Sequence, residues 1–156
     1  MAGSPFDTGQ VRSYKLEVDG VELAHFQELS GLTEEYDVVK YEFVDKDGRK
    51  GVSLQPGNYK PGEVTLKRGT SDDMKLSDWF DLVAAGQAAL ARKNLKISML
   101  DGALDKTVAS FTLANAWPKK IEYSGVKSSG NEASIETVVI VYEELRRDGA
   151  KRNALG

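Results

Sequence analysis

The sequence contains no cysteine and only one histidine in 156 residues. Without cysteine the chain can form neither disulfides nor thiolate metal sites. No segment approaches the roughly 20 consecutive apolar residues that a membrane-spanning helix needs. The first residues have neither the basic nor the apolar region of a secretory signal peptide, so we expect the chain to be made in the cytoplasm and to start its life soluble.

Motifs that would indicate an enzyme or a ligand site are incomplete. His25 has no partner motif, so we interpret it as a structural or surface residue. Residues 57–62 have the spacing of a phosphate loop, but Glu63 stands where the lysine must be. Residues 45–48 suggest a calcium loop, but Lys50 occupies its obligatory glycine position. We therefore predict no catalytic residue, no cofactor and no metal.

Charge and composition favour one soluble domain. With 21 basic and 24 acidic side chains the formal net charge is −3, which argues against a dedicated nucleic-acid binder. The apolar share of 40% is ordinary for a globular protein, and a chain of this length can bury a real core. We expect a flexible amino-terminal arm at residues 1–10, one domain at 11–145 and a charged tail at 146–156.

Period-2 alternation of apolar residues is the main secondary-structure signal. It is clear in Tyr14–Val18, and Asp19-Gly20 behind it is a two-residue hairpin signal. Residues 45–62 form the longest irregular stretch, with a short strand at 52–54 inside it. Trp117-Pro118 is expected to bend the chain between two strands. The other expected strands lie near residues 21–26, 36–43, 64–66, 95–99, 108–113, 121–123 and 132–143.

One helix is expected at about residues 72–91. Ser71 is its predicted N-cap, and a stripe at helical spacing begins at Leu76 and Trp79 and extends to Leu90. Gly86 weakens the helix near its end. Seven or eight strands with one helix and no alternation of strands and helices predict a mainly β fold, an antiparallel β-barrel or sandwich with one packed α-helix.

Two strands are apolar on both faces. Val38-Val39 and residues 138–142 carry apolar side chains at consecutive positions, whereas a strand of a single antiparallel barrel needs only one apolar face. A second copy of the chain would supply the missing cover, and closure into a ring would protect open strand edges. The pattern therefore indicates assembly rather than catalysis.

Several short motifs occur in order along almost the whole chain, from residue 11 to residue 145. They are Phe26-x-Glu28-x-Ser30-Gly31-Leu32-x-x-Glu35, Val64-Thr65-Leu66-Lys67-Arg68-Gly69, Trp79 in the helix, Asn115-Ala116-Trp117-Pro118, Gly130-Asn131-Glu132-x-x-Ile135-Glu136 and Tyr142-Glu143-x-Leu145. Together they resemble the tail-tube protein family of contractile phages. That family includes the inner-tube subunits of phage-tail-like contractile injection systems.

The resemblance implies a fold similar to the secreted ring protein of type VI systems, with two packed sheets and a helix on the flank. It implies a structural subunit whose copies form six-membered rings that stack into a hollow tube. The implied partners are a contractile sheath protein, baseplate and cap proteins, and effector cargo in the lumen. A phage virion tail and an intracellular or extracellular contractile particle are both consistent with the motifs. The alternatives are a tube-initiating or baseplate paralogue and a free ring that carries effectors.

Two contact surfaces are expected on this basis. We assign ring stacking to the long loop together with the amino-terminal arm, and the contact residues to Lys46, Asp47, Arg49, Lys50, Tyr59 and Lys60. We expect the last strand to lie at or beside the seam between subunits. The seam residues are Val39, Tyr41, Val139 and Val141.

Overall fold

The structure is a computed structural model that describes residues 11–102, 106–125 and 134–149. The arm expected at residues 1–10, most of the loop at 124–131 and the end of the expected tail lie outside the described residues. Within them the chain forms ten strands and two helices. In chain order these are β1 (Val11–Val18), β2 (Val21–Phe26), β3 (Glu28–Ser30), β4 (Tyr36–Val44), β5 (Lys50–Tyr59), β6 (Gly62–Gly69), α1 (Lys75–Ala84), α2 (Ala88–Ala91), β7 (Lys93–Asp101), β8 (Lys106–Ser124), β9 (Ile135–Tyr142) and β10 (Glu144–Arg147).

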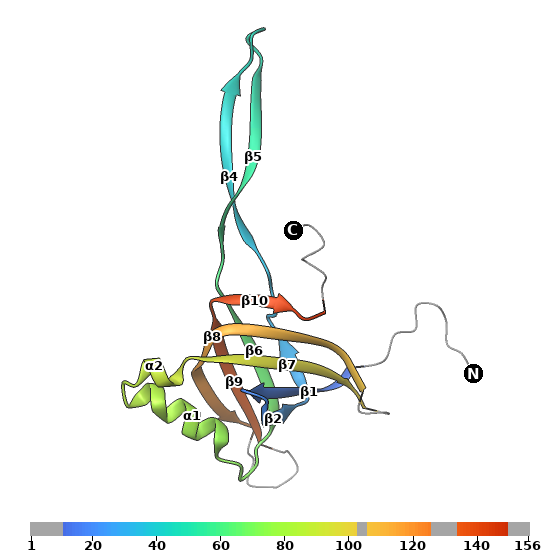
Figure 1. Ribbon diagram of the computed structural model, residues 1–156, viewed down its shortest axis with the longest axis vertical. Coiled ribbons are helices and arrows are strands. Elements are labelled where there is room, and N and C mark those ends of the chain that lie inside the picture. Colours follow the sequence, from blue (N-terminus) through green and yellow to red (C-terminus); the bar gives the residue numbers. More distant parts are fainter. Residues whose placement is uncertain (1–10, 103–105, 126–133, 150–156) are drawn as a thin grey trace, which may run out of the picture.

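The body of the molecule is a sandwich of two antiparallel sheets that share β8. One sheet joins β2, β1, β7, the first part of β8 and β10, and the other joins the second part of β8, β9, β6 and β3. Among the described strands, β2 and β3 lie at the two ends of the order, so the sheet does not close into a barrel. The mainly β, antiparallel fold class is confirmed in its sandwich form. A separate hairpin of β4 and β5 projects from this body along the long axis of the molecule (Figure 1).

The bend in β8 carries the chain from one sheet to the other. Asn115 has a left-handed backbone with φ of 52°, a conformation that asparagine adopts more readily than most residues. β8 pairs with β7 and β10 up to this region and with β9 from Trp117 onward. Pro118, which has no N–H, lies beside a shift in the register with β9. The bend expected at Trp117-Pro118 therefore lies where β8 changes sheets.

The strand β10 corrects the expected start of the charged tail. Residues 146 and 147 were assigned to the tail, but they pair with β8 in the sheet. The Glu143 N–H donates to the carbonyl oxygen of Ala114 at 3.0 Å, so the chain follows the bend of β8 as it leaves β9. Leu145 is buried between exposed charged neighbours. The prediction was wrong because this pairing is with a distant segment, and the local charges gave no sign of it.

The single helix predicted at 72–91 is two helices. Gly86 has a φ of 76° and ends α1. The Gly86 N–H donates to the Val83 carbonyl, and the Gln87 N–H donates to the Leu82 carbonyl, which is the Schellman arrangement that a glycine favours. The N-cap is Met74 rather than Ser71. The chain then begins α2, so one continuous helix was the wrong prediction.

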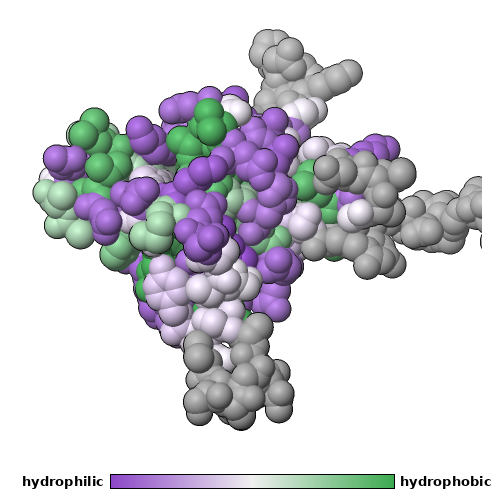
Figure 2. All heavy atoms as spheres, turned by 90° about the horizontal axis from the view of Figure 1, so that it is seen from below, coloured by the Kyte–Doolittle hydropathy of each residue, from purple (hydrophilic) through white to green (hydrophobic). Residues whose placement is uncertain are grey.

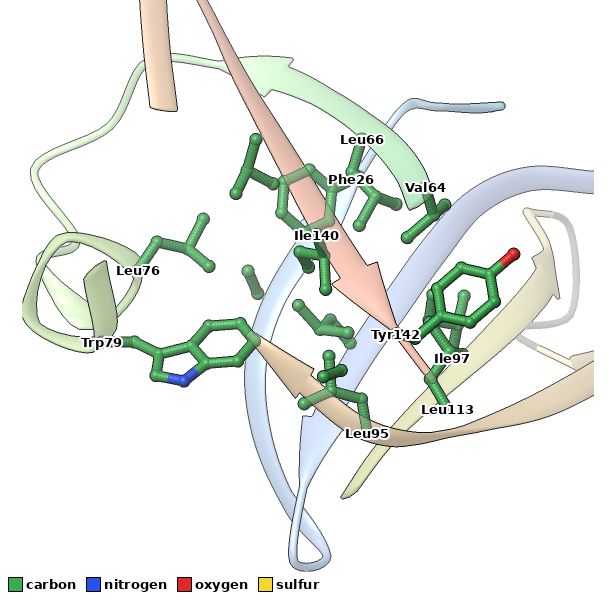
Figure 3. Packing of buried hydrophobic residues seen from close by; sticks show 14 of the residues in the cluster. Phe26, Val64, Leu66, Leu76, Trp79, Leu95, Ile97, Leu113, Ile140 and Tyr142 are labelled. Atoms are coloured by element: carbon green, nitrogen blue, oxygen red, sulfur yellow. The ribbon is translucent and has the colours of Figure 1, made fainter. Parts of the chain in front are cut away.

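The core lies between the two sheets and is closed on one side by α1. Its buried apolar residues are Leu16, Ala24, Phe26, Val64, Leu66, Leu76, Trp79, Leu95, Ile97, Leu113, Ala116, Val138, Ile140, Tyr142 and Leu145. Figure 3 shows Leu76 and Trp79 pointing from the helix into this cluster. The indole N–H of Trp79 donates to the carbonyl oxygen of Ala91 at 2.7 Å, which ties α1 to α2.

Figure 2 shows the end of the molecule opposite the hairpin, where polar and apolar residues are mixed and apolar groups gather on the side of the two helices. Leu90, expected on the buried stripe of the helix, is exposed, while its neighbour Ala91 is fully buried. The change of direction at Gly86 is the reason, because it breaks the helical periodicity that placed both segments on one face.

Ile140→Ala should lower the free energy of unfolding by about 2–5 kcal/mol, because it leaves a cavity in the middle of the core. Ile135→Ala is the matched control on the same strand; its side chain is 43% exposed, and we expect a loss of less than about 1 kcal/mol. Urea denaturation of the monomeric protein measures both. Equal losses would contradict the assignment of the inner face of β9.

Candidate functional site

The most distinctive surface is the projecting hairpin, which we define as residues 36–59. It contains β5 at residues 50–59, so the prediction of a long irregular loop over residues 45–62 is wrong. β4 and β5 pair over almost their full length, from Tyr36 opposite Tyr59 to Val44 opposite Lys50. The hairpin signal was present as Asp47-Gly48 but was outweighed by the glycines and prolines around it. At 3.3–3.4 Å per residue the hairpin is about 30 Å long.

Hydrogen bonds close the tip of the projecting hairpin. The Asp45 carboxylate accepts from the backbone N–H groups of Asp47 at 2.9 Å and Arg49 at 2.8 Å. The Asp45 N–H donates to the Arg49 carbonyl, and Gly48 supplies the positive φ that this turn needs. Residues 45–48, which the sequence already excluded as a calcium loop, thus belong to a hairpin turn. Its carboxylate binds backbone, and basic and acidic side chains project from it into solvent.

Both faces of the projecting hairpin carry exposed apolar side chains. Val39, Tyr41 and Phe43 share one face, where Phe43 lies over Gly51 so closely that a Cβ there would come within 2.4 Å of its ring. The opposite face of the hairpin carries Val38, whose side chain is 67% exposed. The remaining exposed apolar residues of this second face are Val44, Val52 and Leu54.

A two-stranded hairpin has no sheet or helix behind it to cover such residues. In water a hairpin of this kind is at best marginally stable by itself, and contiguous exposed apolar surface marks interaction sites. The projecting hairpin is therefore the candidate functional site, because its exposed apolar faces are suited to contact with another protein surface.

The expected stacking residues are divided between the two ends of the projecting hairpin. Four of them, at positions 46, 47, 49 and 50, lie together at the tip and are exposed. Tyr59 and Lys60 lie at the base, where the Lys60 ammonium group contacts the carboxylates of Glu35 at 3.3 Å and Asp37 at 3.4 Å. The hydrogen bond to Glu35 and its charge, followed by those of Asp37, raise the pKa of Lys60 above its usual 10.5. The structure therefore does not bring the six residues together.

The expected seam residues lie on two different sheets. Val39 and Tyr41 are on the projecting hairpin, whereas Val139 and Val141 are on β9. β9 pairs with β6 on one edge and β8 on the other, so its edges are covered by its own chain. Alternate residues from Val138 to Tyr142 point into the core, and Val139 and Val141 are half-buried on the outer face. Val141 lines an open cleft with Trp117 and Pro61.

Elsewhere in the described residues, the histidine and the carboxylates do not gather into a metal centre. His25 contacts the carboxylate of Glu22 and is half-exposed on β2. In the described part of the chain, no three His, Cys, Asp or Glu side chains lie close enough to hold a metal ion. Neither helix in those same ranges has the length and apolar character needed to cross a membrane.

The family profile described as T4-like virus tail tube protein gp19 matches residues 11–146. The chain belongs to this tail tube family. The resemblance in the sequence motifs is therefore confirmed. No curated protein matches the chain at a significant level.

Solved structures share the fold of this tail tube protein. A chain of the sheath-tube complex of PVC, an extracellular contractile injection system, has a TM-score of 0.74 at 19% identity, covering 94% of both chains. One in the tube terminating cap of the anti-feeding prophage, AFP, has a TM-score of 0.75 at 18% identity over 96% of both. Another in the AFP baseplate has a TM-score of 0.69 at 21% identity, over 96% of this chain and 99% of that one.

Two of the family motifs meet in a buried ion pair that sequence analysis did not predict. Arg68 of β6 and Glu136 of β9 are directly opposed in the sheet, and their side chains form a salt bridge that is almost fully buried. The Arg68 guanidinium also lies over the ring of Phe26, 5.5 Å from its centroid. The pair fixes the register of β6 against β9 in the tail tube fold, since a shift would leave two buried charges unpaired.

Glu136→Gln should destabilise the folded monomer by about 3–5 kcal/mol, because it leaves the Arg68 charge buried without its partner. The double variant Arg68→Met/Glu136→Leu removes both charges and should recover most of that loss. Guanidinium denaturation of the three proteins measures the differences. A single variant as stable as the parent would show that the pair contributes nothing to the core.

Proposed function

We propose that this chain is the inner-tube subunit of a contractile injection system or of a contractile phage tail. In this role six copies close into a ring, the rings stack into a hollow tube, and a contractile sheath protein surrounds it. Baseplate and cap proteins bind the ends of the tube, and its lumen holds effector cargo. The chain is made in the bacterial cytoplasm and acts mechanically, as a structural protein rather than an enzyme.

One observation carries this proposal beyond family membership: the projecting hairpin exposes apolar residues on both of its faces. An isolated subunit would leave this surface in water, whereas a polymer of identical subunits covers it in every copy. Support also comes from the similar solved structures, which are described as a sheath-tube complex, a tube terminating cap and a baseplate with six-fold symmetry.

We assign the contact between stacked rings to the projecting hairpin. Its reach of about 30 Å takes the tip well clear of the body. The charged residues Lys46, Asp47, Arg49 and Lys50 at the tip then face the neighbouring ring, and the apolar faces lie against a neighbouring subunit. Charges of both signs at the tip set the register of the contact rather than its strength. Tyr59 and Lys60 remain at the base and support the contact indirectly.

We assign the seam within a ring to the outer face of β9. Val139 and Val141 are apolar, half-buried and directed away from the core, beside the half-buried Trp117. Val39 and Tyr41 join this seam from the projecting hairpin of a neighbouring subunit. In this arrangement the seam is a contact of sheet faces, because both edges of β9 are already paired.

A subunit at the end of the tube is the alternative function. It is favoured by the occurrence of the fold in the AFP cap and in a PVC sheath/tube terminator, the latter with a TM-score of 0.71. Long cylinders formed by the purified chain alone would support the main tube subunit. Assemblies that stop after one ring would support the terminal subunit, and single rings that retain bound cargo would support a free carrier.

Shortening the projecting hairpin should abolish long tubes and leave the body folded. Lys40 and Leu54 are register partners, so residues 41–53 can be replaced by Asn-Gly, a turn that closes two paired positions. We expect unchanged melting of the body by circular dichroism and no tubes by negative-stain electron microscopy. Tubes of normal length from the shortened chain would refute the assignment of the ring contact.

A matched pair of substitutions tests whether polymerisation depends on apolar residues of the hairpin or on exposed apolar residues anywhere on the surface. Val38 on the projecting hairpin and Val21 on the body are both 67% exposed. Val38→Asp should raise the concentration needed for polymerisation at least about tenfold, the equivalent of 1.4 kcal/mol per contact. Val21→Asp should leave it unchanged. Sedimentation of polymer from a concentration series measures both values.

Val139→Asp should give a folded protein that does not close into rings, because it replaces apolar contact surface of the proposed seam with a charge. Thr137→Asp is the control: it introduces the same charge on the same face of the same strand, at a half-buried residue that is not one of the proposed seam contacts, and it should leave ring closure intact. Analytical ultracentrifugation measures whether rings form, and circular dichroism measures whether the subunit is folded. Normal rings, or loss of the folded monomer, would each argue against a seam at this position.

A further inference from the structure

The root of the projecting hairpin is the place where three distant segments of the chain meet. We define it as residues 31–35, which enter the hairpin, residues 59–62, which leave it, and residues 142–145, which join β9 to β10. The side chains of Tyr59 and Tyr142 connect these segments. Neither connection is part of a strand ladder, so both are contacts in addition to the hydrogen bonds of the sheets.

Tyr142 reaches from the core to the segment that enters the hairpin. Its ring is buried in the cluster, and Figure 3 shows its hydroxyl oxygen pointing out of the cluster. The hydroxyl accepts the N–H of Thr33 at 3.2 Å and donates to the carbonyl oxygen of Gly31 at 3.2 Å or of Thr33 at 3.1 Å. Burial raises the pKa of Tyr142 above its usual 10.0, so the hydroxyl keeps the proton it donates.

Two glycines make room for this contact. A Cβ at Gly62 would lie 2.6 Å from the Tyr142 hydroxyl oxygen and 2.8 Å from the carbon that bears it. At Gly31, where φ is 94°, a Cβ would lie 2.5 Å from the carbonyl oxygen of Glu63. The leaving segment therefore packs directly on the tyrosine, and the entering segment packs directly on the backbone of β6, at distances that no Cβ would allow.

Tyr59 makes the reverse connection, from the hairpin to the body. Its hydroxyl accepts the N–H of Leu145 at 3.0 Å and donates to the carbonyl oxygen of the same residue at 3.5 Å. Leu145 is itself buried in the core. The ring of Tyr59 packs edge-to-face on Tyr36 across the hairpin, with centroids 5.2 Å apart. Both strands of the hairpin are thereby tied to β10.

The angle of the hairpin depends on these contacts because its length acts as a lever. A rotation of about 10° at the root moves the tip of a hairpin about 30 Å long by roughly 5 Å. A displacement of that size removes a specific contact between side chains. The exposed ion pairs of Lys60 add little constraint, since such pairs are weak in water.

We propose that Tyr59 and Tyr142 are positioning residues, which hold the projecting hairpin at a fixed angle to the body before a second copy of the chain binds it. The inference rests on the proposed function, in which that second copy belongs to the neighbouring ring. A hairpin held in its bound orientation loses less entropy on association than one that swings freely, so the hydroxyls favour assembly without touching the partner.

The test is a distance measurement on the full chain, which has no native cysteine to interfere. Lys46→Cys at the tip and Lys96→Cys on β7 carry nitroxide labels, and pulsed electron paramagnetic resonance gives the distribution of distances between them in the monomer. The parent should give one narrow distribution. Tyr59→Phe/Tyr142→Phe keeps both rings and removes both hydroxyls, so its distribution should be broader.

Tyr123→Phe is the matched control, because it removes a tyrosine hydroxyl that bonds to Ser77, away from the root. It should leave the distribution narrow. In the same proteins without labels, the double variant should raise the polymerisation concentration about tenfold while Tyr123→Phe should not. An unchanged distribution in the double variant overturns the inference, and a broadened one with unchanged polymerisation overturns the link to assembly. A parent chain that never polymerises counts against the proposed function, and the distance measurement still decides the role of the tyrosines.

Discussion

The passage of β8 from one sheet to the other is the constraint on which the rest of the fold depends. One continuous strand pairs with β7 and β10 up to Ala116 and with β9 from Trp117 onward, so the two sheets are covalently joined at the bend. β9 and β10 follow the same bend, and this places Tyr142 and Leu145 at the root of the projecting hairpin. The orientation of the hairpin relative to the body therefore depends on the bend in β8.

The body and the projecting hairpin differ in how their apolar side chains are covered. The body buries a continuous apolar cluster between its sheets and uses a buried ion pair to hold β6 in register with β9. The projecting hairpin has no second layer, and its apolar side chains stay in contact with water in the isolated subunit. A stable body with an uncovered extension fits the proposed assembly, in which other copies of the chain would cover the extension.

Charge has a limited and local role. Both signs are mixed at the hairpin tip, and the ion pairs at its base are exposed, so neither region supplies much net stability. In the proposed assembly the apolar faces of the hairpin provide the contact surface, and the charges around them restrict the orientations in which that surface can bind. Such an arrangement fits the proposed tube, in which the same contacts would repeat in every subunit.

The sequence by itself determined the features that depend on near neighbours. Alternation and Asp19-Gly20 predicted the first hairpin, and the ordered motifs predicted the family. Only the tertiary structure decided features that depend on distant pairing: β5 in place of a loop, β10 in place of the start of a tail, and the opposition of Arg68 to Glu136. Local patterns report which residues prefer a strand, but the partner strand, the register and the covered face are set by contacts between segments far apart in the chain.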